Sequence, residues 1–224
     1  MKKILFSALV LGLIGVAPVD AQMTKEQQKQ RNEYVKQQRK ELNKKESKDA
    51  KKQAKEFKKQ GWQVTPGSLT LEKQFDRSML VQNEVDANWY PVYVWGEAMS
   101  IGETYDAAKL QATELATFNL ATQIQSEIVG MVENSVANKQ LGADEAASVT
   151  TTVAETTKMI SQSLGRVIPL VEAYRVLDNK NKEVYIRVAY NHNNAMEAAK
   201  KVVREELEKK GEELREKLDK AMGW

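Results

Sequence analysis

Residues 102–138 read GETYDAAKLQATELATFNLATQIQSEIVGMVENSVAN, and this stretch decides the fold. Its apolar residues recur at spacings of three and four, which places them on one face of a single long helix. That face consists of Ala108, Ala112, Leu115, Ala116, Leu120, Ala121, Ile124, Ile128 and Val132. Thr104 can cap the N-terminus, and Asp106 lies where the helix dipole favours an anion. Because the first half of the face is rich in alanine, we expect a β-sheet to approach the helix closely there.

Strands that flank this helix in the sequence can supply the sheet. Residues 90–101 (YPVYVWGEAMSI) are rich in β-branched and aromatic residues, and Gly96 marks either a bulge or the close approach of the helix. Residues 166–178 and 183–191 flank a short Asn-rich connection and predict a β-hairpin. We therefore expect an α+β fold, in which the long helix and a second helix pack on a small antiparallel sheet of about three strands.

The same spacing rules predict further helices. Residues 143–164 predict the second helix, and residues 69–86 predict a shorter one that Ser68 or Thr70 can cap. Trp62 is expected to fold back on the domain as an anchor. Residues 194–222 predict a charged last helix with a narrow apolar seam, which suits docking against the N-terminal helix or against another chain.

Composition limits the chemistry. The chain has 224 residues, 42% hydrophobic and 29% charged, with a formal net charge of +3, which suits one globular domain with charged extensions. It has no cysteine and one histidine, His192. Disulfides, thiolate metal sites, cysteine nucleophiles and a two-histidine metal site within one chain are therefore excluded. We expect no metal and no cofactor.

The N-terminus has the pattern of a signal peptide. Lys2 and Lys3 precede an apolar run over residues 4–16, and Ala21 ends a site suited to cleavage. The alternative is an uncleaved anchor, but this run is shorter than the roughly 20 residues that span a membrane. We expect an exported protein, periplasmic or secreted, that is cleaved near Ala21. With no cysteine there, a lipid anchor on such a residue is excluded, and no later run is long enough to span a bilayer.

Residues 22–60 are expected to form a basic helical arm. Between residues 23 and 60, fourteen Lys and Arg face six Asp and Glu, which gives a local charge of +8. The arm is either a charged spacer that docks along a thin apolar seam or a surface that binds an anionic membrane or cell-wall polymer. The candidate contact residues are Lys44, Lys45, Lys51, Lys52, Lys58 and Lys59. Export disfavours nucleic acid as the partner. The expected layout is a signal peptide (1–21), the arm (22–60), an α+β domain (61–195) and a C-terminal helix (196–224).

The order of these parts resembles a known family. A strand ending in Gly96-Glu97-Ala98, followed by Asp106-Ala107-Ala108 opening an alanine-spaced helix with Leu120-Ala121, is similar to bacterial envelope proteins of the LPP20 lipoprotein family. The N-terminal domain of the flagellar T-ring protein resembles the same family. The resemblance covers about Ser68 to Ala199. It implies a compact α+β domain, an envelope location and no enzymatic activity. Those lipoproteins carry a lipidated cysteine that this chain lacks, so lipid anchoring does not transfer.

Taken together, these patterns favour a non-enzymatic envelope protein that acts through protein–protein contacts or assembly. The alternative is a module that binds an anionic surface through the basic arm. An enzyme is disfavoured because no Gly-rich phosphate loop, Gly-x-Ser-x-Gly elbow or distinctive carboxylate pair occurs. Candidate contact residues for a protein partner are Tyr93, Trp95 and Tyr185, and a flat sheet face that exposes them would favour such a partner. The terminal helices offer a route to self-association.

Overall fold

The computed structural model describes residues 25–138 and 140–224. The predicted signal peptide, residues 1–21, lies outside the described residues. The chain divides after Lys44 into two units. The described part of the first unit is a polar helix, α1 (Lys25–Asn43), and the second unit begins at Lys45. The division therefore falls within the basic arm rather than after residue 60.

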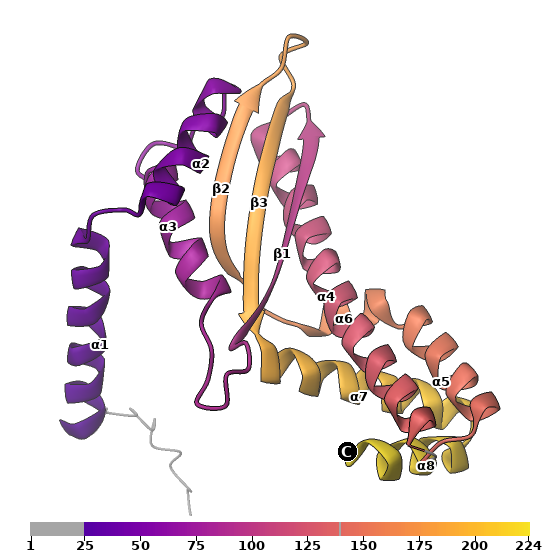
Figure 1. Ribbon diagram of the computed structural model, residues 1–224. Helices are drawn as coiled ribbons and strands as arrows, with labels where there is room; N and C mark the ends of the chain where they lie inside the picture. Colours follow the sequence, from indigo (N-terminus) through magenta and orange to yellow (C-terminus); the bar gives the residue numbers. More distant parts are fainter. Residues whose placement is uncertain (1–24, 139) are drawn as a thin grey trace, which may run out of the picture. The chain divides into compact units, whose positions relative to one another are not determined.

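The second unit contains the sheet and most of the helices (Figure 1). Its elements, in chain order, are α2 (Lys48–Lys59), α3 (Leu71–Gln82), β1 (Tyr93–Gly102), α4 (Tyr105–Ala137), α5 (Ala143–Glu155), α6 (Thr157–Ser163), β2 (Ile168–Val176), β3 (Lys182–Asn191), α7 (His192–Lys210) and α8 (Glu212–Met222).

The three strands form one antiparallel sheet in the order β1-β3-β2, so β3 is central and β1 and β2 are the edges. β1 pairs with β3 from Tyr93 opposite Asn191 to Gly102 opposite Lys182. The β2–β3 pair is the predicted hairpin, with an irregularity between Pro169 and Val171. The predicted α+β class, with a long helix on a three-stranded antiparallel sheet, is confirmed.

Helix α4 covers one face of the sheet, and its alanines allow close contact. A Cβ atom on Gly96 would lie 2.2 Å from the carbonyl oxygen of Ala116, so the helix backbone rests directly on β1. Thr104 caps the helix by accepting a hydrogen bond from the backbone N–H of Ala107 at 3.2 Å. Every residue of the predicted inner face is fully buried except Leu115, which is 42% exposed. Leu115 lies on the exposed flank of the helix, and its assignment to the core was wrong.

Helices α2 and α3 cover the opposite face of the sheet (Figure 1). Ala50 and Ala54 of α2 are fully buried there, together with Phe75 of α3. Trp62 is only 4% exposed, as expected of an anchor that folds back on the domain. The second half of the basic arm is thus part of the folded unit. The thin seam predicted for the arm consisted of Val35, Leu42, Ala50, Ala54 and Phe57, and the side chains of Val35 and Leu42 lie outside the described part of the structure.

Beyond the sheet, the C-terminal half of α4 packs with α5, α6, α7 and α8 in a helical layer (Figure 1). The helix predicted over residues 143–164 is interrupted at Thr156. The hydroxyl of Thr156 donates to the carbonyl oxygen of Val153 at 2.8 Å, and such local bonding competes with a regular helix. Within α5, the hydroxyls of Thr151 and Thr152 also donate to backbone carbonyls, four residues earlier.

The helix predicted over residues 194–222 is also two helices. Gly211 adopts φ of 149°, a region that favours glycine, and α8 then folds back toward α7. Leu207 of α7 and Leu218 of α8 are fully buried in the core that α4 shares with the sheet. The expectation that this apolar seam would dock on the N-terminal helix or on another chain was therefore wrong.

Candidate interaction surfaces

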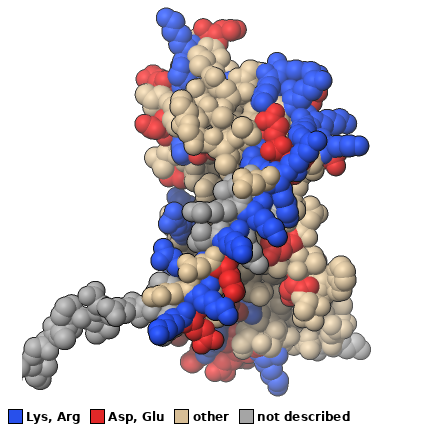
Figure 2. All heavy atoms as spheres, turned by 90° about the vertical axis from the view of Figure 1, so that its left-hand side faces the viewer, with Lys and Arg blue, Asp and Glu red and all other residues tan. Residues whose placement is uncertain are grey.

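The outward face of α2 carries four lysines in one line. They follow one another at spacings of four, three and four, and all are exposed: Lys48, Lys52, Lys55 and Lys59. We call these four residues the lysine stripe. Lys59 pairs with Glu56 at 2.9 Å, and among the described residues no ion pair is seen for the other three. Lys and Arg side chains gather along one side of the upper half of this view of the molecule (Figure 2).

The lysines predicted as contacts are only partly brought together. Lys52 and Lys59 belong to the stripe, whereas Lys51 and Lys58 point sideways and pair with Glu46 and Glu72 at 3.6 and 2.6 Å. The hydrogen bond from Lys58 lowers the pKa of the Glu72 carboxyl below its usual value. Lys44 and Lys45 are exposed in the segment between α1 and α2. The sequence analysis missed Lys48 and Lys55, although their helical spacing from Lys52 could have identified them.

The three aromatic residues proposed as partner contacts are covered to different extents. Tyr185 is 5% exposed, and its ring packs edge-on against Phe57 of α2 and against Trp62 at centroid distances of 5.2 and 6.2 Å. Tyr93 and Trp95 are half-buried. The flat, exposed face that would have favoured a protein partner at these residues is not present, because α2 and α3 pack on this side of the sheet.

Tyr185 belongs to a partly buried polar network that crosses three elements. Its hydroxyl donates to Glu97 Oε2 at 2.5 Å, and the same oxygen accepts from Arg187 Nε at 2.8 Å. Arg187 also donates to Ser78 Oγ on α3 at 3.1 Å and lies 5.3 Å from the ring centroid of Trp95. Burial raises the pKa of the Tyr185 hydroxyl, so it stays protonated. The network holds α3 against β1 and β3 and contains no activated nucleophile.

A loop between α3 and β1 displays the most exposed aromatic side chains among the described residues. Trp89 is 84% exposed and Tyr90 is 69% exposed. The backbone N–H of Asp86 donates to the carbonyl oxygen of Tyr90 at 2.8 Å, and that of Trp89 donates to the carbonyl of Asp86 at 3.1 Å. The Asp86 carboxylate accepts from the N–H groups of Asn88 and Tyr90 at 2.8 and 3.0 Å. The loop is thus tied to itself by backbone and side-chain bonds.

Trp89 stands at the tip of this loop with φ of 64°. A bulky side chain rarely adopts this left-handed conformation, which costs on the order of 1–2 kcal/mol. Such strain persists where surrounding bonds fix the backbone, and it concentrates at functional positions. The sequence analysis did not select Trp89. The run Asp86-Ala87-Asn88 is typical of a turn, which the sequence analysis did not assign, but no sequence pattern shows that the tryptophan faces solvent.

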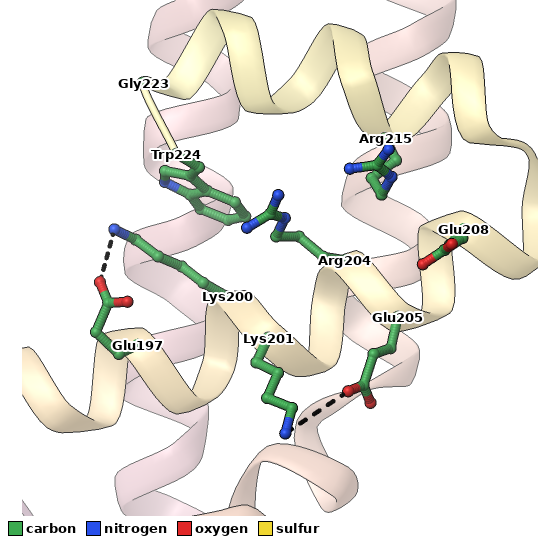
Figure 3. Close-up of a pocket in the computed structure, with 9 residues that line it drawn as sticks. All are labelled: Glu197, Lys200, Lys201, Arg204, Glu205, Glu208, Arg215, Gly223 and Trp224. Atoms are coloured by element: carbon green, nitrogen blue, oxygen red, sulfur yellow. Dashed lines mark hydrogen bonds and ion pairs between the residues drawn. The ribbon is translucent and has the colours of Figure 1, made fainter.

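The pocket between α7 and α8 has a volume of about 470 Å³ (Figure 3). Trp224 forms one wall, and the ammonium of Lys200 lies 5.5 Å from its ring centroid. The cations around it are already neutralised: Lys200 pairs with Glu197 at 3.1 Å, and Arg204 pairs with Asp219 at 2.7 Å. This arrangement offers neither a nucleophile next to a base nor an unpaired cluster of charge, so it carries no catalytic assignment.

Within residues 25–138 and 140–224, no group of three or more His, Cys, Asp or Glu side chains is placed to hold a metal ion. None of the helices in the described part of the chain is long and apolar enough to cross a membrane. His192, the single histidine, begins α7 and lies 2.7 Å from Glu127 on α4. Comparisons of this chain with protein-family models, with curated proteins and with solved structures find no match.

Proposed function

We propose that this protein is an exported, non-enzymatic protein of the cell envelope that acts by binding another protein through Trp89. The observation that carries the proposal is the exposure of this strained tryptophan at the tip of a self-bonded loop. Tryptophan and tyrosine dominate the binding energy of protein interfaces. A loop held in one conformation loses little entropy on binding, which favours affinity. The proposed membership of the LPP20-like family and the signal-peptide pattern support an envelope location.

The partner should offer an apolar socket, because Trp89 is 84% exposed and lines none of the described pockets, whereas small-molecule sites are concave. A photo-reactive benzophenone amino acid at position 89, in the full chain produced in its own cells, tests this. We expect one adduct of defined mass at position 89 and none when the same group replaces Leu110, which is 64% exposed on α4. Equal or absent labelling at both positions would refute the proposed contact.

Replacing Trp89 by glycine separates binding from folding. Glycine adopts a positive φ without strain, so Trp89→Gly should keep or raise the midpoint temperature of unfolding. The same variant should no longer bind the protein that the benzophenone at position 89 cross-links. A variant that loses stability and binding together would indicate that Trp89 supports the fold instead. Export is tested by the intact mass of the native protein, which should lack residues 1–21.

The lysine stripe favours a second candidate function, binding to an anionic surface. Three of its four ammonium groups have no ion-pair partner among the described residues, and the stripe lies on a helix that is fixed to the sheet. Vesicles of phosphatidylglycerol should sediment with the full chain at low salt and much less at physiological salt. The Lys52→Glu/Lys55→Glu double variant should lose this binding. The Lys158→Glu/Lys180→Glu control, which makes the same charge change elsewhere, should keep it.

A further inference from the structure

The two edges of the sheet differ in how they are protected. A sheet edge presents unpaired backbone N–H and C=O groups that can pair with another chain. On the β2 edge, Gln63 exchanges two backbone hydrogen bonds with Tyr174, at 2.8 and 2.9 Å. The N–H of Glu172 donates to the side chain of Gln74 at 2.7 Å. The edge formed by β2 is thus closed at both of its central outward-facing residues.

The first half of the β1 edge is closed by side chains of α4. The carbonyl oxygens of Trp95 and Glu97 accept hydrogen bonds from the amides of Gln123 and Asn119, at 2.7 and 2.9 Å. These two carbonyls face away from β3. Because backbone groups alternate in direction along an antiparallel pair, the next outward-facing residues on β1 are Met99 and Ile101.

The second half of the β1 edge is open. Within the described part of the chain, no group bonds to the outward backbone atoms of Met99 or Ile101. Their side chains are 55% and 51% exposed. Natural edge strands are usually protected by a lysine, a proline or a bulge, and residues 99–101 contain none of these. We call residues 99–101 the open edge.

Exposed apolar side chains of α4 lie near the open edge. Ser100 Oγ donates to Gln111 Oε1 at 2.5 Å, which ties α4 to this part of β1. Leu115 and Phe118 follow on the same side of the helix and are 42% and 40% exposed. They lie on the α4 face of the sheet, whereas Met99 and Ile101 project from the other face. A strand added at the open edge would therefore meet apolar groups on both sides.

We propose that the occupant is a second copy of this chain, whose open edge pairs antiparallel with the first about a two-fold axis at Ser100. This arrangement places Met99 opposite Ile101 of the other copy, and four backbone hydrogen bonds form between the two outward residues of each strand. The result is one continuous six-stranded sheet. The proposal is independent of the contact proposed for Trp89.

Two features favour a second copy over a foreign extended peptide. The amides of Asn119 and Gln123 limit the open edge to two outward residues, too few to hold a free peptide, and a two-fold arrangement uses only those two. Adjacent strands lie about 4.8 Å apart, and α4 packs over β3 as well as over β1, so the two α4 axes would lie farther apart than the two β1 strands and near the roughly 8–10 Å of packed helices. The Leu115 and Phe118 flanks would then face the partner's α4 helix.

The absence of cysteine permits a direct test in the full chain. Across the axis, the two copies of residue 100 form a non-hydrogen-bonded pair with Cα atoms about 4.5 Å apart, within the range of a disulfide. Ser100→Cys should therefore give a disulfide-linked dimer on mild oxidation. Val176→Cys, a more exposed position on the β2 edge, should cross-link at least about tenfold more slowly, because only encounters in solution bring it together.

A matched pair of charge variants tests the same interface without a cross-link. Ile101 on β1 and Val176 on β2 are both β-branched and are 51% and 50% exposed. The wild-type chain should sediment as a dimer at high concentration. Ile101→Lys should raise its dissociation constant about tenfold or more, whereas Val176→Lys should leave it unchanged. A wild-type monomer at every concentration, or a dimer that Ile101→Lys leaves intact, would overturn the proposal. Circular dichroism of each variant confirms that it is folded.

Discussion

The carbonyl oxygen of Ala116 occupies the space where a side chain on Gly96 would begin, 2.2 Å from an ideal Cβ position. This relationship fixes α4 on β1, because neither backbone can withdraw without opening the core around Leu120. Gly96→Ala should therefore destabilise the fold by about 1–3 kcal/mol or more, measured by chemical denaturation. Ala116→Leu overpacks the same contact and should cost a similar amount.

Gly130 provides the control for this prediction. It lies within α4, and a Cβ atom added there would meet no atom within 4 Å. Gly130→Ala should stabilise the fold by roughly 0.5–1 kcal/mol, because alanine favours a helix. If both glycine variants shift the midpoint in the same direction, the close contact at Gly96 is not what holds α4 in place.

The burial of Tyr185 predicts a large effect on stability. Removing its side chain would leave a cavity between Phe57 and Trp62 and break the hydrogen bond to Glu97. Tyr185→Ala should cost about 3–5 kcal/mol of unfolding free energy. Tyr90→Ala, at a 69% exposed position, should change it by less than about 0.5 kcal/mol. Equal effects of the two variants would contradict the coverage of the sheet by α2.

The docking of α2 can be tested by proteolysis. Ala54 is fully buried, and an aspartate there would place an unpaired charge in the core, which costs several kcal/mol. Ala54→Asp should release α2 and allow chymotrypsin to cleave after Phe57, as identified by the mass of the fragments. Lys55→Asp introduces the same residue on the exposed side of the helix and should leave Phe57 resistant. Rapid cleavage of the wild-type chain at Phe57 would show that α2 does not stay docked.

Glu145 should contribute to the pH dependence of stability. Hydrogen bonds from Lys217 at 2.7 Å and from the backbone N–H of Gly142 at 3.0 Å hold its pKa below the ordinary value of 4.5. Because the pKa of this carboxyl is lower in the folded state, its ionised form stabilises the fold at pH values above the ordinary pKa of 4.5. This stabilisation is lost as the pH falls through the lower pKa of the folded state. Wild type should therefore exceed Glu145→Gln in stability at neutral pH, with the difference vanishing in acid. In a Lys217→Met background, the difference at neutral pH should shrink.

Local patterns predicted the elements that depend on them. The 3.6-residue spacing identified α4, the hydroxyl of Thr104 identified its start, and the alternation on either side of the Asn-rich turn identified the β2–β3 hairpin. The prediction failed where a local break was weak in the sequence. The interruption at Thr156 and the reversal at Gly211 each turned one predicted helix into two, because a single hydrogen bond or dihedral angle decided the chain direction.

The candidate surfaces were predicted less well than the fold. Lys52 and Lys59 were identified because charge is a property of the residue itself, and the rest of the stripe follows from helical spacing. Tyr185 was misplaced because alternation along a strand shows which residues share a face but not whether another element covers that face. Trp89 was missed for the same reason: its exposure depends on how α3 and β1 are positioned, which no local pattern encodes.

The sequence by itself determined the α+β class, the alanine-rich contact between α4 and β1, and the absence of cysteine chemistry, because each follows from residue type or short-range periodicity. Only the tertiary structure decided that α2 covers the sheet, that α8 folds back on α7, and that Met99 and Ile101 remain open at the edge of β1. These features arise from contacts between residues far apart in the chain. Several arrangements bury a similar apolar area, and their relative free energies depend on the packing of the whole unit.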